Sequence, residues 1–184
     1  ISFSHAQVTL KAYSRTILGD VFMKKYSNVE LLDCTFRDGG YYNRWNFPCE
    51  IVQDQINILS QIGVNYCEMG YRKLADSRGG EQYTTSEDYL SSFKKPEGFN
   101  YVVMCDAGDL IRAAELEELG ALIKESAAVS SIDLLRIAVH YSALPELQGC
   151  IKQLVACGYH VALNLMQISE RTDEEIAAIR QRYG

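Results

Sequence analysis

Five short segments rich in apolar and β-branched residues alternate with helical patterns from residue 29 onward, and this alternation limits the possible folds more than any other feature of the chain. Alternation of this kind is typical of strands joined by helices. Parallel neighbours in a sheet need a crossover of about a dozen residues or more, which a helical segment provides. The sequence therefore predicts an α/β fold with parallel strands at 29–36, 64–70, 100–105, 132–139 and 160–166.

The segments between these strands carry the usual signals of helix start and end. In the segment 48–63, Pro48 suits a first helical turn, Gly63 ends the pattern, and the apolar residues between them predict one wide apolar face. Thr172 and Glu175 form a capping-box pattern at the start of the last helix. Helices are therefore expected at 48–63, 109–126 and 145–158, and from 172 onward.

Three further predictions concern the organisation of the chain. Residues 1–28 are expected to be an amino-terminal extension, for which a helix over 6–18 is one interpretation. Residues 74–85 are rich in Gly, Ser and Thr and are expected to form a flexible loop at the carboxyl end of a strand. The chain begins at Ile1, which suggests a piece of a longer protein.

Two parallel α/β architectures are compatible with five strand–helix units. A doubly wound, flavodoxin-like sheet is complete with five strands, whereas a (β/α)₈ barrel needs eight units and about 250 residues. The number of units alone favours the doubly wound sheet. Both architectures place functional residues at the carboxyl ends of the strands.

Composition narrows the class of partner. The formal net charge of -6 argues against a nucleic-acid or anionic-membrane surface, because both bind clustered Lys and Arg. No apolar run approaches the roughly 20 residues that a membrane span requires. The six cysteines form no C-x-x-C pair, and several lie in apolar runs where a thiol behaves as a small hydrophobic group. We therefore expect a reduced cytoplasmic protein that acts on small molecules.

The segment 31–43, LLDCTFRDGGYYN, combines an apolar run with a charged pair and two glycines. Asp38 offers a hard oxygen ligand for Mg²⁺ or Mn²⁺, and Arg37 can stabilise a developing oxyanion. Gly39 and Gly40 are expected to let the backbone turn away and approach a ligand closely. The alternative is a structural ion pair at the rim of the sheet, and chemistry alone gives the two interpretations even weight.

Three segments in order resemble one enzyme family. The run DCTFRDGG (33–40) resembles the D-x-T-L-R-D-G signature of the DRE-TIM metallolyases, also called the HMGL-like or pyruvate carboxyltransferase family. LLRIAVHYSALPE (134–146) and GYHVALNLMQIS (158–169) resemble segments of its 4-hydroxy-2-oxovalerate aldolase branch. The resemblance implies a TIM (β/α)₈ barrel of which 29–184 would be the first five units, and it outweighs the number of units as a guide to the fold.

The resemblance also implies a chemistry. Asp38 matches the family's metal ligand for Mn²⁺ or Mg²⁺, and Arg37 matches the arginine that stabilises an enolate. The implied function is a metal-dependent carbon–carbon lyase or aldolase that cleaves a 2-oxo acid through a pyruvate enolate. Tyr41 stands where that branch has a histidine base, and tyrosine is a poor base at neutral pH because its ordinary pKa is about 10. The identity of the base is therefore open.

Two further residues enter through the resemblance. Glu68 matches an acidic residue near the family's active site, with an ion pair to Arg72 as the structural alternative. His140 aligns with the branch's histidine at the working end of the fourth strand, whereas His160 is expected at the opposite end of the sheet. The family's His-x-His metal pair does not occur anywhere in this sequence.

Three candidates follow from the residues themselves. Arg136 lies within an apolar strand, where a charge is costly unless paired, so it is either part of an ion pair or a ligand for the substrate carboxylate. Asp106 closes the third strand and is either a ligand or a helix cap. Asn164 is expected to point into the barrel.

Two classes of function remain open at this stage. The first is the metal-dependent lyase on a 2-oxo acid, incomplete in this chain. The second is a non-catalytic α/β module, a truncated or degenerate barrel used for small-molecule binding or association. Because a partial barrel exposes its edge strands, we also expect a homo-oligomer.

Overall fold

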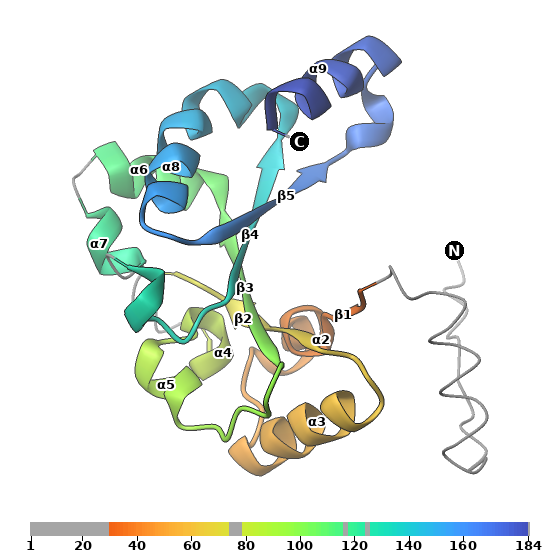
Figure 1. The fold of residues 1–184 in the computed structure, drawn as a ribbon, viewed down its shortest axis with the longest axis vertical. Helices are drawn as coiled ribbons and strands as arrows, with labels where there is room; N and C mark the ends of the chain where they lie inside the picture. The colour runs from red at the N-terminus through yellow and green to blue at the C-terminus, as the bar shows by residue number, and fades with distance from the viewer. Residues whose placement is uncertain (1–29, 74–78, 116–117, 124–125, 184) are drawn as a thin grey trace. The chain divides into compact units, whose positions relative to one another are not determined.

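Five parallel strands form one sheet in the computed structural model, which describes residues 30–73, 79–115, 118–123 and 126–183 (Figure 1). Their order across the sheet equals their order along the chain, and the sheet curls into a half-barrel. The strands are β1 (Leu32–Asp33), β2 (Tyr66–Tyr71), β3 (Asn100–Asp106), β4 (Leu134–His140) and β5 (His160–Met166).

This order distinguishes the two architectures that the sequence left open. A doubly wound sheet reverses its strand order at a switch point, whereas this sheet runs β1-β2-β3-β4-β5 without reversal. The α/β class and the parallel sheet are confirmed, and the preference that the number of units gave to a doubly wound sheet is wrong. A curled half-barrel is consistent with part of a larger barrel.

Helices follow the strands along the chain. They are α2 (Thr35–Asn43), α3 (Cys49–Gln61), α4 (Glu81–Thr84), α5 (Glu87–Ser91), α6 (Ala107–Glu115), α7 (Leu119–Leu122), α8 (Leu144–Ala156) and α9 (Asp173–Tyr183), with short 3-10 turns at η1 (Ala127–Val129), η2 (Tyr141–Ala143) and η3 (Ile168–Glu170). The segment predicted to be helical over 109–126 contains two separate helices, most of α6 and all of α7. Within the described ranges, no helix combines the length and apolar character needed to cross a membrane.

The capping box of α9 is present as predicted. The backbone N–H of Thr172 donates to Oε2 of Glu175 at 2.9 Å, and the N–H of Glu175 donates to Oγ1 of Thr172 at 3.3 Å. These two bonds satisfy N–H groups that a helix start otherwise leaves unpaired. The predicted helix at 6–18 and residues 74–78 of the predicted loop at 74–85 lie outside the described residues, and α4 occupies 81–84, so the second half of that loop prediction is wrong.

The first strand is much shorter than predicted, because a helix begins immediately behind it. The carboxylate of Asp33 accepts from the backbone N–H of Thr35 at 3.2 Å and from its hydroxyl at 2.8 Å. These local bonds compete with strand pairing and favour a helix start. The predicted strand over 29–36 is therefore wrong at its carboxyl end, and α2 carries the charged pair instead.

The two glycines of this segment also play a different part from the one predicted. Gly39 and Gly40 lie within α2 rather than in a turn. A Cβ added at Gly40 would lie 2.0 Å from the ring of Trp45, so the missing side chain makes room for this tryptophan. The expectation that the backbone turns away at these two glycines is wrong.

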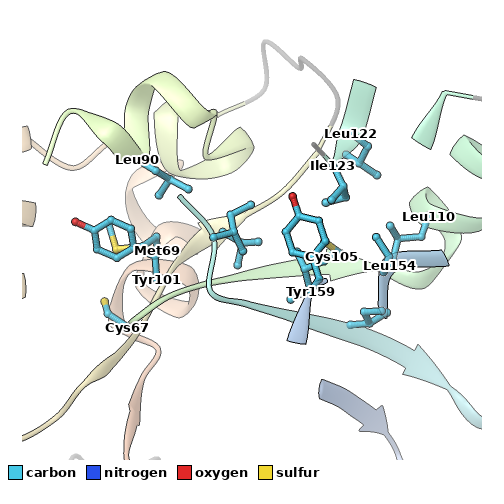
Figure 2. Packing of buried hydrophobic residues seen from close by; sticks show 14 of the residues in the cluster. Cys67, Met69, Leu90, Tyr101, Cys105, Leu110, Leu122, Ile123, Leu154 and Tyr159 are labelled. Carbon is cyan, nitrogen blue, oxygen red and sulfur yellow. The ribbon is translucent and has the colours of Figure 1, made fainter. Parts of the chain in front are cut away.

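One face of the sheet packs against the helices and forms the main core (Figure 2). In β3, alternate residues Tyr101, Val103 and Cys105 are buried in this core, where they meet side chains from α5, α6 and α8. The period of two along the strand leaves the residues between them on the other face. That second face, which we call the inner face, includes Met104 and Asp106.

A bulge in β2 changes which residues reach the inner face. The pairing of β2 with β3 shifts register between Glu68 and Gly70, so that Tyr71 pairs with Met104. Gly70 has a φ of +148°, and a Cβ there would lie 1.9 Å from the carbonyl oxygen of Gln82, so glycine is required. Glu68 and Tyr71, three positions apart, consequently lie on the same face.

The wide apolar face predicted for the helix at 48–63, which corresponds to α3, is only partly buried. Val52, Ile56 and Leu59 of α3 are in the core. Three isoleucines on a neighbouring side of the helix are 52–60% exposed, namely Ile51, Ile58 and Ile62. Positions i, i+7 and i+11 fall on one narrow stripe of a helix, so these three side chains form a continuous exposed strip.

Candidate functional site

A fully buried glutamate occupies the centre of the inner face. Glu68, on β2, is 0% exposed, and each of its carboxylate oxygens accepts a hydrogen bond from a different arginine. Nε of Arg37, on α2, lies 2.8 Å from Oε2, and Nη1 of Arg136, on β4, lies 2.9 Å from Oε1. The fold therefore brings three of the predicted site residues into one charged cluster.

A second set of contacts surrounds this cluster. Nη1 of Arg37 lies 2.5 Å from Oδ1 of Asp38. Nη2 of Arg136 donates to Oδ1 of Asn164 on β5 at 3.1 Å, and its Nη1 approaches Sγ of Cys34 at 3.5 Å. Asn164 lies on the inner face as predicted, and Arg136 is part of an ion pair, the structural interpretation offered for it.

Arg72 is not the partner of Glu68, so this structural alternative is wrong. The guanidinium of Arg72 instead donates from Nε to the carbonyl oxygen of Leu122 at 2.7 Å and from Nη1 to that of Thr85 at 2.5 Å. Among the described residues, its carboxylate contact is with Glu87 at 3.8 Å. Arg72 thus connects the end of β2 to α7 and to the residue that follows α4, and the partners of Glu68 are the two arginines of the inner face.

The charges of the cluster do not cancel within its buried part. Two guanidinium groups face the single buried carboxylate of Glu68, and the fourth charge, on Asp38, is on a side chain that is 59% exposed. The side chains of Arg37 and Arg136 are 16% and 20% exposed, so both can still be approached from solvent. Within its buried part the cluster therefore holds two guanidinium groups and one carboxylate, and among the described residues the exposed carboxylate of Asp38 balances the second guanidinium.

The ionisation of the neighbouring groups reflects this environment. Burial lowers the pKa of Arg37, but its hydrogen bond and attraction to Glu68 raise it by more, so the guanidinium stays charged. Burial, followed by the charge of Glu68, raises the pKa of the Cys34 thiol to about 11. Since thiolate is the reactive form of cysteine, Cys34 is a neutral contact of the cluster at pH 7 and not a nucleophile.

Tyr41 lies at the edge of this cluster, on the exposed side of α2. It is 64% exposed, and its hydroxyl lies 2.8 Å from the hydroxyl of the buried Tyr71. Burial raises the pKa of Tyr71, the hydrogen bond with Tyr41 raises it further, and Arg37 lowers it by less. Both phenols are thus placed as hydrogen-bonding groups, and the catalytic role assigned to Tyr41 stays a prediction.

Asp106 and His140 are at the carboxyl ends of their strands, as predicted, but outside the arginine cluster. The carboxylate of Asp106 pairs with Nζ of Lys73, which also lies 3.1 Å from Oδ2 of Asp109. His140 is exposed at the end of β4, and His160 begins β5 at the opposite end of the sheet, where it pairs with Leu134. The catalytic and substrate-binding roles assigned to these residues stay predictions.

The residues present do not by themselves fit the metal ion that the family resemblance implies. Asp38, the predicted ligand, pairs with a guanidinium, and a neighbouring cation disfavours binding of a second one. Across residues 30–73, 79–115, 118–123 and 126–183, no three His, Cys, Asp or Glu side chains come together in a way that could hold a metal ion. We therefore derive no chemical step through a metal.

Two hollows of the surface lie away from the cluster. One, of about 170 Å³, lies between the start of α8 and α9, where Leu144 and Ile179 are among its lining residues. The other, of about 520 Å³, lies between α6 and α8 beside Ile111 and Gly149. Both hollows belong to the outer helices, and no predicted site residue lines either of them.

Four residues of the site were not predicted from the sequence. Cys34 and Lys73 contact predicted site residues directly, while Trp45 and Tyr71 pack beside Arg37. Lys73 carried a usable signal, since a lysine two residues after the end of an apolar strand lies at the working end. The position of Tyr71 depends on the bulge in β2, and the local sequence pattern does not predict this bulge.

No family model matches the chain, and no curated protein matches it. One solved structure is similar: the N-terminal domain of a "putative aldolase" from Bacteroides vulgatus, with a TM-score of 0.70 and 24% sequence identity. The likeness covers 83% of this chain and 51% of that one, so the chain spans about half the length of the structure it matches. At this identity the comparison shows a shared fold, and function is a separate question.

Proposed function

We propose that the inner face forms one side of the active site of an aldolase-type carbon–carbon lyase that acts on a 2-oxo acid. The observation that carries the proposal is that two arginines, both still partly exposed, share the single buried carboxylate of Glu68. A substrate carboxylate is the complementary charge, and arginine binds carboxylates through two parallel N–H bonds. The resemblance of 33–40, 134–146 and 158–169 to the DRE-TIM metallolyases supports the same reaction class.

Within this proposal the two arginines have different tasks. Arg136 is held on β4 by Glu68 and Asn164 and is a fixed positive charge for the substrate carboxylate. Arg37 lies on a helix, and its contacts with Glu68 and Asp38 engage two of its three nitrogens. A guanidinium has five N–H donors, so Arg37 can also stabilise the oxyanion of an enolate.

We also propose that the half-barrel is part of a TIM (β/α)₈ barrel. Closure of the half-barrel into a TIM (β/α)₈ barrel would place the inner face inside the barrel, where such enzymes bind their substrates at the carboxyl ends of the strands. A divalent ion, Mn²⁺ or Mg²⁺, would need ligands other than those assembled among the described residues.

The test is an assay of pyruvate release by the full-length protein. We would incubate it with 4-hydroxy-2-oxopentanoate, with added Mn²⁺ or Mg²⁺ or with a chelator, and couple pyruvate to NADH oxidation. Arg37→Lys is expected to lower turnover by about 10²-fold, the scale of losing one oxyanion donor. The matched control is Arg180→Lys on the exposed side of α9, which should keep full activity.

Two results would overturn the proposal. One is pyruvate release at background under all metal conditions, and the other is full activity of Arg37→Lys. Either would favour the alternative of a non-catalytic module, for which one observation also speaks: both oxygens of Glu68 are already satisfied within the protein. The predicted homo-oligomer is compatible with both functions and is tested separately below.

A further inference from the structure

Four aromatic side chains gather directly beside the arginine cluster. Tyr41, Trp45, Tyr71 and Tyr83, which we call the aromatic platform, contact one another edge to face or tilted. The ring centroids of Tyr41 and Trp45 are 4.7 Å apart, and those of Trp45 and Tyr83 are 4.9 Å apart. Such separations are those of favourable aromatic pairs.

The backbone is shaped to hold Trp45 at this place. Arg44 and Trp45 both have positive φ, 57° and 54°, a conformation that costs energy for residues with a side chain. The turn brings the indole back over α2, where it fills the space left by Gly40 and donates from Nε1 to the carbonyl oxygen of Arg37 at 3.0 Å. The platform is therefore anchored on Arg37, one of the two arginines of the cluster.

The two sides of the platform differ in what they face. Nζ of Lys73 lies 5.3 Å from the ring centroid of Tyr71 and 5.6 Å from that of Tyr83, so a cation already interacts with these rings. Tyr41, by contrast, is 64% exposed although its ring packs on Trp45. The accessible part of the platform is thus the side of Tyr41 and Trp45, next to Arg37.

A simple structural role accounts for only part of this arrangement. Tyr71, Met104 and Ala138 form a small buried cluster on the inner face, against which Trp45 and Tyr83 pack. That cluster would be complete without Tyr41, whose ring adds exposed apolar area to the surface. An apolar ring left in water beside the partly exposed guanidinium of Arg37 matches a ligand with an anionic head and a flat apolar tail.

We infer that the site takes an aryl-substituted 2-oxo acid, whose carboxylate lies at Arg37 and Arg136 and whose ring stacks on Tyr41 and Trp45. This inference rests on the proposed function, because it assumes that a 2-oxo acid binds at the arginines. It names the tail of the substrate, which neither the resemblance nor the solved structure specifies. Ring stacking of this kind gives selectivity between acids with the same head.

The test compares two acids that differ only in the ring. Isothermal titration calorimetry of the intact protein would measure the Kd values of 4-phenyl-2-oxobutanoate and 2-oxobutanoate. We expect the phenyl compound to bind at least about tenfold more tightly, because the binding free energy of one aromatic pair and of burying a ring together corresponds to this ratio of Kd values. Tyr41→Ala is expected to reduce this ratio to below about threefold, whereas Tyr41→Phe keeps the ring and should keep the ratio.

Tyr42 offers a matched control on the same helix. It is 95% exposed, so Tyr42→Ala removes an equally large ring without touching the platform and should leave the ratio unchanged. Equal affinities for the two acids, or equal losses in the Tyr41 and Tyr42 variants, would overturn the inference while the proposed function stands. Absence of binding by both acids would overturn the proposed function and the inference together.

Discussion

Replacement of Glu68 by glutamine tests the central feature of the inner face. In the wild type, one carboxylate accepts from Nε of Arg37 and from Nη1 of Arg136. Glu68→Gln keeps the shape of the side chain but removes its charge. One end of the amide can still accept a hydrogen bond, whereas its NH₂ end faces a guanidinium donor and cannot pair with it.

The structure sets the expected size of the effect. Breaking a buried ion pair from one side costs about 3–5 kcal/mol, because a charge is left buried without compensation. The two arginine side chains are 16% and 20% exposed, so water can hydrate them in part, and we expect the low end of this range, about 3 kcal/mol. For a chain of this size that corresponds to a Tm about 6–12 °C lower.

Asp38→Asn supplies the comparison. It removes the same kind of charge from the same cluster, but from a side chain that is 59% exposed, where an ion pair contributes less than about 1 kcal/mol. Urea unfolding followed by circular dichroism would measure both variants. A loss below about 1 kcal/mol in Glu68→Gln, or equal losses in the two variants, would refute the central role of the buried carboxylate.

A double variant separates charge from packing. Adding Arg136→Met to Glu68→Gln removes the positive charge that the first change left unbalanced, while Arg37 and Asp38 still balance each other. We therefore expect the double variant to be more stable than the sum of the single variants predicts, by about 1 kcal/mol or more. Additive losses would mean that Glu68 stabilises the fold through packing alone.

Three further predictions concern other parts of the fold. Gly70→Ala is expected to be severely destabilising in thermal melts, because the added Cβ would lie 1.9 Å from a carbonyl oxygen, whereas Gly149→Ala meets nothing within 4 Å and should stabilise α8 by about 0.5–1 kcal/mol. The raised pKa of Cys34, about 11, predicts that its alkylation, followed by peptide mass mapping, accelerates up to about pH 11. The same shift means that stability falls as the pH rises from the ordinary thiol pKa of about 8.5 toward 11, since the unfolded chain loses this proton first. Ile58→Lys, in the exposed strip of α3, is expected to shift the predicted homo-oligomer toward monomer in sedimentation velocity, and an unchanged distribution would exclude this strip as the contact.

The strands and most helices could be predicted because their signals are local. β5 occupies the predicted range 160–166, and the apolar runs of β2, β3 and β4 are displaced by no more than two residues. The end of the first strand could not be predicted, because hydrogen bonds between Asp33 and Thr35 favour a helix start within the apolar run. Hydrophobic periodicity carries no information on such side-chain hydrogen bonds. The strand–helix pattern alone did not give the strand order, because this order depends on how the units stack and not on any one of them; the sequential order agrees with the partial barrel that the resemblance implied.

The site was predictable residue by residue but not in its connections. Arg37, Glu68 and Arg136 were each singled out, yet the pairing of Glu68 with both arginines depends on a helix, β2 and β4 meeting on one face of a curled sheet. The aromatic platform depends on a register shift at Gly70 and on a left-handed turn at Trp45. Both are properties of the folded backbone, and no spacing along the chain encodes them.

The structural and functional interpretations of Arg37 and Asp38 are compatible, because the two carboxylates around Arg37 differ in how easily they can leave. Glu68 is fully buried, so moving its carboxylate away from Arg37 would leave a buried charge without a partner. Asp38 is largely exposed, so its carboxylate can be hydrated at little cost when it moves away. A substrate carboxylate can therefore replace Asp38 at Arg37 while Glu68 keeps the guanidinium in place. In the calorimetric experiment, Asp38→Asn should accordingly bind 2-oxobutanoate at least as tightly as the wild type, and a large loss of affinity would show that Asp38 itself contacts the ligand.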